Sequence, residues 1–210
     1  MYWVQTGKTP SRSDERNFSI GDGMPWATPA DLVEDSPITE TKECISQEGL
    51  AGMRPVPDGT VLVNGIGAGV GKVGIAGTNM VFNQQIHALL PKRNLHISNY
   101  LMFCMIARRD EMLTLANLNT IPILNGERLG RLMLPIPDMS IQENIVTEIN
   151  REGQFQRVIS GKTARSISRL REYRAALITA AVTGKIDVGT YGIKGTTSAT
   201  LDRIEEGMQA

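Results

Sequence analysis

The chain has 210 residues, of which 41% are hydrophobic, and it carries 22 basic and 22 acidic side chains. This composition excludes general disorder, because enough apolar surface is present to build a core. The balanced charge favours no particular partner, but residues 151–174 hold seven basic side chains against two acidic ones. That local excess is either a surface for phosphate or an ordinary solvated helix face.

The sequence predicts a short-stranded sheet in its first half. The first 60 residues are rich in Gly, Pro, Ser and Asp, which form turns between short apolar segments. Residues 60–67 (TVLVNGIG) favour a strand after the Asp58-Gly59 turn, and 72–77 and 85–90 favour two more. Glycines and asparagines between them are typical of a curved or bulged sheet.

A helix is predicted over residues 96–116, where the apolar spacing changes to steps of three and four. Ser98 or Asn99 is expected to cap its start. Residues 119–138 return to short extended pieces around one helical turn. Pro135 and Pro137 then exclude regular helix and mark a boundary.

The longest predicted element is a helix from about Ser140 to Val182. Ser140 and Glu143 have the spacing of a capping box, whereas Gly153 and Gly161 are expected to weaken, kink or break the helix. If continuous, it is about 60 Å long. Its apolar residues recur every three or four positions: Ile141, Ile145, Ile149, Val158 or Ile159, Ile167, Leu170, Leu177 and Ala181.

That apolar seam needs a partner. It is covered by a second helix, from this chain or another, or the helix folds back in two pieces onto its own domain. Gly184 fits the left-handed position just past the helix end. The predicted fold class is α+β: a globular domain with a small twisted sheet and a few helices over 1–137, a long helix that would dimerise through this seam over 138–188, and a flexible tail over 189–210.

The sequence lacks the features that known enzyme motifs and metal sites require. Residues 69–74 (GVGKVG) match a dinucleotide fingerprint, but no helix is predicted after them and no acidic residue follows at the required distance. A tight turn that leaves Lys72 exposed explains them more simply. His87 and His96 lack neighbouring ligands, and His87 is expected to be an ordinary strand residue. We therefore predict no catalytic residues, no metal and no cofactor.

The polar side chains that remain suit recognition of DNA. Amides pair with adenine, arginine and lysine pair with guanine, and hydroxyls and cations hold phosphates. The amides of residues 83–85 (NQQ) could instead bond to neighbouring backbone. The residues predicted to bind DNA are Lys8, Thr9, Arg12, Lys72, Asn83 and Gln84.

Cys44 and Cys104 match no metal spacing, and no secretory signal or membrane-spanning run is apparent in the sequence. We therefore expect a cytoplasmic protein with no membrane partner.

The ordered segments resemble a known family. TGKTPS, PWATPADL, VLVNGIGAGVGKVGIA, FNQQIHALLP, LMLPIPDMSIQENIV and LREYRAALITAAVTGKIDV occur in the order seen in specificity subunits of type I restriction–modification systems. The resemblance covers roughly Gly7 to Val188. Two departures stand out: the family usually has two recognition domains and two helices, and residues 142–144 read QEN where it usually has Glu-Gln.

The resemblance implies a half-length, non-catalytic specificity subunit. One target recognition domain would read half of a bipartite sequence in double-stranded DNA, and the long helix would pair antiparallel with a counterpart as a coiled coil. The implied partners are modification (methyltransferase) subunits, which hold S-adenosylmethionine, and a restriction subunit in the full complex.

A single helix of this kind would pair in a homodimer or with another specificity half. The residues expected in the pairing seam are Ile145, Ile149, Ile167, Leu170, Leu177 and Ala181. The alternative function is a helical dimerisation adaptor whose globular head binds protein, which the neutral overall charge favours.

Overall fold

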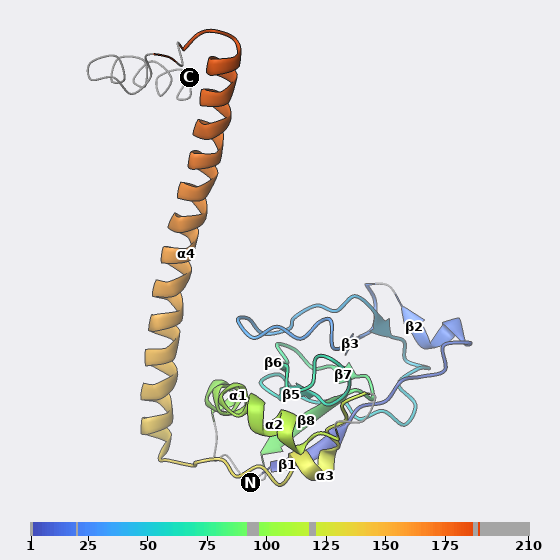
Figure 1. The fold of residues 1–210 in the computed structure, drawn as a ribbon. Helices are drawn as coiled ribbons and strands as arrows, with labels where there is room; N and C mark the ends of the chain where they lie inside the picture. The colour runs from blue at the N-terminus through green and yellow to red at the C-terminus, as the bar shows by residue number, and fades with distance from the viewer. Residues whose placement is uncertain (1, 20, 92–96, 118–120, 187–188, 190–210) are drawn as a thin grey trace. The chain divides into compact units, whose positions relative to one another are not determined.

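The structure, a computed structural model, describes residues 2–19, 21–91, 97–117, 121–186 and 189. The chain divides into two compact units, Met1–Ile149 and Asn150–Ala210. The first holds all the strands and short helices, and the second consists, where described, of most of one long helix and its end (Figure 1).

The first unit contains two four-stranded sheets, which agrees with the predicted α+β class. The first sheet is antiparallel throughout, and in the second β3 pairs antiparallel with β4 and parallel with β7. In spatial order, the first sheet has β1 (Tyr2–Thr6), β8 (Ile86–Pro91), β5 (Val61–Asn64) and β6 (Val73–Ile75). The second has β2 (Phe18–Ser19), β4 (Cys44–Ile45), β3 (Met24–Ala27) and β7 (Val81–Phe82).

The centre of the first sheet is buried on both faces. In β5, Val61 and Val63 join the core cluster that contains Leu101 and Met105 of the helices, whereas Leu62 joins the cluster that contains Phe82 of the second sheet. This alternation follows from the two-residue period of a strand. The three strands predicted over 60–90 are therefore confirmed as β5, β6 and β8.

The helix predicted over 96–116 is two helices. It is interrupted at Arg108, where φ is −104° and ψ is 22°, so the chain turns between α1 and α2. Neither Ser98 nor Asn99 caps α1, because the N-cap residue is Ile97 and it has no side-chain cap. The short helices of this unit are η1 (Glu15–Asn17), α1 (Ser98–Ala107), α2 (Arg109–Leu115) and α3 (Gly126–Leu129).

The long helix α4 (Met139–Val182) is one element of 44 residues. Gly153 and Gly161 do not break it, which corrects that expectation. The predicted capping box is also wrong: helical bonds begin with Ile141 and Gln142 donating to the carbonyl of Asp138, so Ser140 lies inside the helix. The tail that follows residue 189, with its predicted flexibility and short terminal helix, lies outside the described residues, as does His96.

Candidate nucleic-acid interface

The loop after β1 is held close to the second sheet by Gly7. A Cβ atom built on Gly7 would lie 2.2 Å from the carbonyl oxygen of Asn83 and 2.3 Å from that of Phe82, so no other residue fits without movement. Lys8 N donates to Phe82 O at 2.9 Å, and Trp26 Nε1 donates to Lys8 O at 3.2 Å. The start of the loop is therefore fixed by backbone contacts.

Four of the predicted DNA-binding residues lie around this loop. Thr9 donates its hydroxyl to Gln84 Oε1, although the two residues are 75 positions apart in sequence. Lys8 Nζ reaches the carbonyl of Ala51 at 3.5 Å. We call Lys8, Thr9, Arg12 and Gln84 the recognition cluster.

Arg12 is a rigid member of this cluster rather than a freely moving loop cation. Its NH1 and NH2 groups donate to the two carboxylate oxygens of Glu43, each at 2.8 Å. Its guanidinium carbon lies 4.6 Å from the ring centroid of Phe18 and 5.0 Å from that of Trp26. The hydrogen bonds with Arg12 lower the pKa of Glu43, so the pair stays ionised at neutral pH.

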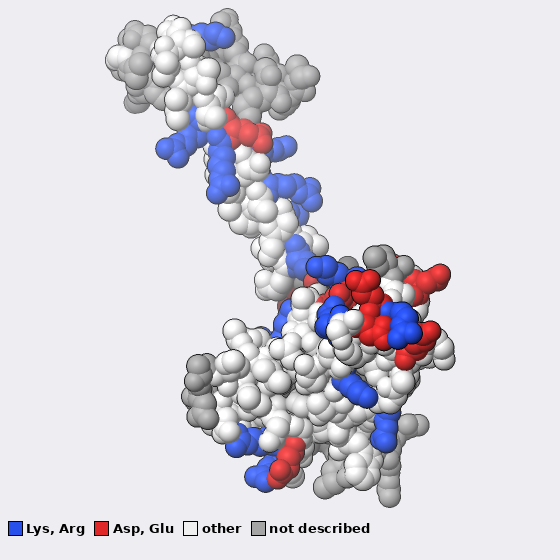
Figure 2. Space-filling model, turned by 90° about the vertical axis from the view of Figure 1, so that its right-hand side faces the viewer, with Lys and Arg blue, Asp and Glu red and all other residues white. Residues whose placement is uncertain are grey.

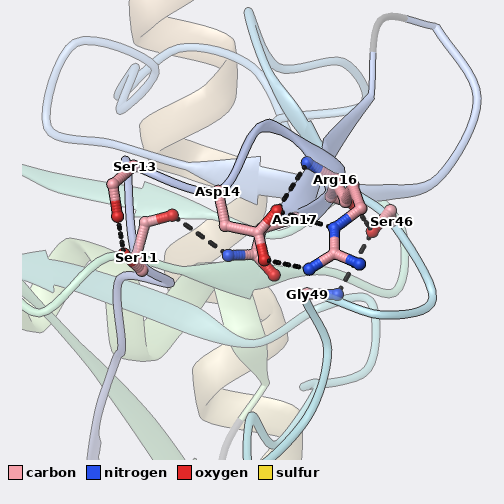
Figure 3. Close-up of polar contacts among 7 residues, drawn as sticks. All are labelled: Ser11, Ser13, Asp14, Arg16, Asn17, Ser46 and Gly49. Atoms are coloured by element: carbon pink, nitrogen blue, oxygen red, sulfur yellow. Dashed lines mark hydrogen bonds and ion pairs between the residues drawn. The ribbon is translucent and has the colours of Figure 1, made fainter.

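A polar network ties the rest of the loop to residues 46–49 (Figure 3). Asn17 Nδ2 donates to Ser11 O at 3.0 Å, and Ser46 Oγ donates to Arg16 O at 2.5 Å while it accepts from Gly49 N at 3.1 Å. Asp14 accepts from Arg16 at 2.8 and 2.9 Å. The loop that carries the recognition cluster is thus anchored at several points, which favours a pre-organised binding surface.

Asn83 and Lys72 have different surroundings. Asn83 is buried, and its side chain accepts from Gln85 N and donates to Gln85 Oε1, each at 3.1 Å. Lys72 lies at the β5–β6 turn, half-buried, with Nζ 3.4 Å from Pro29 O, so the expectation that it is exposed is wrong. Neither side chain makes a recorded contact with the recognition cluster.

The glycine-rich segment is a turn between strands, as the sequence indicates. Gly71 N donates to Asn64 O at 2.9 Å, and Gly71 has a φ of 81°, which favours glycine. Arg109 Nε donates to Gly71 O at 3.2 Å and its guanidinium pairs with Glu34. This arrangement gives no helix start at which a pyrophosphate could bind.

Two exposed residues beside the cluster, Trp3 and Arg54, were not predicted from the sequence. Trp3 and Arg54 line an open pocket of about 660 Å³ along β1, together with Lys8. Trp3 is 63% exposed. Gln5 Nε2 donates to Arg54 O at 2.7 Å, which connects β1 to the loop before β5. Only tertiary structure brings Trp3 and Arg54 together, because 51 positions separate them in the sequence.

The long helix exposes its apolar residues. Ile167 is 46% exposed and Leu170 is 66% exposed, whereas Leu177 and Ala181 are partly buried. At 3.6 residues per turn, Ile159 lies in line with these residues and Val158 does not. The structure therefore shows an amphipathic helix with an uncovered seam, while pairing with a second helix stays a prediction.

The sequence model of a family described as the type I restriction modification DNA specificity domain matches residues 2–154. The chain belongs to this family. The match covers the whole recognition cluster and the start of α4, so the resemblance inferred from the ordered segments is confirmed.

Relatives of this specificity domain are similar to it in sequence or in fold. The type I restriction enzyme MjaIX specificity subunit of Methanocaldococcus jannaschii is 28% identical over 160 residues, which are 70% of this chain and 34% of that protein. The HsdS subunit of Thermoanaerobacter tengcongensis has a TM-score of 0.64 at 20% identity, over 88% of this chain and 43% of that one. A chain from a study of complex assembly and conformational transition of the type I R-M system has a TM-score of 0.70 at 20% identity. The match covers 85% of this chain and 42% of that one.

The chain therefore spans about a third to less than half of the length of these relatives. Among the described residues, no group of three or more His, Cys, Asp or Glu side chains could hold a metal ion. No helix in the described ranges is both long and apolar enough to cross a membrane.

Proposed function

We propose that this specificity domain reads one half of a bipartite sequence in double-stranded DNA through the recognition cluster. Lys8 and Arg12 would supply positive charge for phosphate or guanine, and Thr9 and Gln84 would supply polar groups for base edges. Family membership and the anchored, exposed loop support this role. DNA binding by Lys72 and Asn83 stays a prediction.

The second proposed role, helix pairing, is based on the exposed apolar seam of α4. It would pair antiparallel with the helix of a second specificity half, in a homodimer or with another chain, and so set the separation of the half-sites. Modification subunits would dock on this helix and bring S-adenosylmethionine, and a restriction subunit would join the full complex. The chain itself would contribute recognition and no chemistry.

Selection from a random duplex library tests the recognition role. The chain, co-expressed with its modification subunits, is expected to enrich a bipartite motif. Gln84→Ala is expected to change the preferred base at one position, at a cost of about 1–3 kcal/mol for the best sequence, because a base-edge contact is lost. The matched control Gln154→Ala, an exposed amide of α4, should leave the motif unchanged.

Failure to enrich any sequence would contradict DNA recognition. It would favour the adaptor function, in which the globular unit binds protein. Enrichment of the same motif by Gln84→Ala and by the unsubstituted chain would instead remove Gln84 from the base-reading set.

A further inference from the structure

The middle of α4 has an unusual charge pattern. Between Gly153 and Arg171 the sequence has five cations and no carboxylate. A solvated helix usually places Glu four residues before Lys or Arg, because such pairs stabilise it. In the described part of the chain, no ion pair is recorded for Lys162, Arg165 or Arg169. The charge of this segment is therefore not neutralised by its own helix.

Three of these cations lie on one face. Lys162, Arg165 and Arg169 are spaced by three and four residues, and all three are exposed. At 3.6 residues per turn, their mean direction is about 130° around the axis from that of the apolar seam. Pairing of the seam with another helix would therefore leave these cations accessible. Figure 2 shows Lys and Arg side chains projecting from α4.

The side chains around these cations are short. Apart from Lys162, Arg165 and Ile167, every residue from 160 to 168 is Ser, Gly, Thr or Ala. Ser, Gly and Thr are each less favourable than Ala in a helix interior. A Cβ atom built on Gly161 would meet nothing within 4 Å, so packing within the chain does not require glycine there. A ligand that approaches the helix closely would explain this composition.

The spacing matches the phosphates of a DNA strand. Lys162 to Arg169 spans about 10 Å of helix axis at 1.5 Å per residue. A strand of duplex DNA presents one phosphate per roughly 3.4 Å of its axis, so three cations face about three phosphates. Exposed hydroxyls, such as that of Ser166, can donate to the same phosphates.

We propose that Lys162, Arg165 and Arg169 form a phosphate-binding stripe for duplex DNA that runs along α4 between the two half-sites. The proposal rests on the proposed DNA-recognition function and extends it. The stripe binds the phosphates of the spacer DNA without reading its sequence. It shares no residue with the recognition cluster. An acidic surface of a partner protein is the competing occupant, and the experiment separates the two.

The test compares two double variants of equal charge. Arg165→Gln/Arg169→Gln removes two stripe arginines, and the control Arg157→Gln/Arg171→Gln removes two exposed arginines from other faces of α4. Fluorescence anisotropy with a labelled 40-base-pair random-sequence duplex gives the dependence of log K on log salt. The stripe variant should flatten the slope by about 0.9 for each phosphate contact removed, and the control should not. Equal helicity by circular dichroism confirms that both variants fold.

Equal slopes for the two variants would overturn the stripe. If the unsubstituted chain still enriched a motif from the library, the recognition function would stand without the stripe. Unchanged slopes combined with loss of co-purified modification subunits from the stripe variant alone would assign the surface to the protein partner and overturn the DNA proposal.

Discussion

His87 in β8 uses both of its ring nitrogens inside the first unit. Nε2 lies 2.9 Å from Leu124 O, which can only accept, so Nε2 carries a proton; in the neutral ring Nδ1 then accepts from Thr6 Oγ1 at 3.0 Å. The neutral ring therefore satisfies both contacts. Burial lowers its pKa below the ordinary value near 6.5, against a smaller opposing effect of the bond to Leu124.

This burial makes stability depend on pH. Above pH 6.5, His87 is neutral in the folded and unfolded chains. As the pH falls through 6.5 towards the lower folded pKa, only the unfolded chain takes up the proton, so the free energy of unfolding falls by at most about 1.4 kcal/mol per pH unit. Urea unfolding between pH 7.5 and 5 should show this decrease, and His87→Gln should flatten it. The same flattening in His96→Gln would assign the effect to the other histidine.

The sequence predicted correctly that His87 is an ordinary strand residue, but not what it binds. Thr6 and Leu124 lie 81 and 37 positions away. Thr9 and Gln84 of the recognition cluster are likewise in contact although 75 positions separate them. Local residue patterns contain no information about such pairs, because the sheet register decides which side chains meet.

At the scale of elements, Gln142 fixes the first turn of α4 to the first unit. It is fully buried, its Oε1 accepts from Ile97 N at 3.0 Å, and its Nε2 donates to Pro137 O at 2.9 Å. In the sequence, the QEN segment is apparent only as a departure from the family pattern. The structure shows that one of its side chains connects the starts of α1 and α4.

Replacement of this amide should destabilise the first unit. Gln142→Leu leaves the Ile97 N–H and the Pro137 carbonyl without these bonds, which costs about 1–3 kcal/mol in the free energy of unfolding. Urea denaturation followed by tryptophan fluorescence measures the loss. Gln154→Leu is the matched control on an exposed part of the same helix and should change stability by less than about 0.5 kcal/mol. Equal effects of the two substitutions would argue against the anchoring role.

The end of α4 agrees with the sequence prediction. Gly184 has a φ of 71° and donates from its N–H to Ala181 O at 3.2 Å, while Lys185 N donates to Ala180 O at 2.8 Å. This pair of bonds is the Schellman motif, in which a left-handed residue satisfies the last carbonyls of a helix. The end was predictable because glycine is favoured at this position by its own backbone, whereas the start depended on Asp138 instead of the expected Ser140.

At the scale of the whole molecule, the exposed seam of α4 predicts association. A helix that leaves Ile167 and Leu170 exposed to water is stabilised when a second helix covers these side chains. Two copies of the chain are the simplest source of that second helix.

A pair of double variants tests the seam. Ile167→Gln/Leu170→Gln should convert a dimer to a monomer in sedimentation velocity at micromolar concentration, because the apolar contact is lost. Phe155→Gln/Val158→Gln is the control: these residues are 58% and 51% exposed but lie off the seam by helical phase. Dissociation by the control alone would assign the association to another face, and a monomeric unsubstituted chain would contradict self-pairing.

The sequence by itself determined the periodic and local features: three of the four strands of the first sheet, one long amphipathic helix, its glycine stop and, through ordered segments, the family. These features depend on side-chain period and backbone preference, which neighbouring residues carry. Tertiary structure decided which side chains meet, including Thr9 with Gln84, Arg12 with Glu43, and Gln142 with Ile97. Those contacts depend on sheet register and on packing between distant segments, and no short stretch of sequence encodes either one.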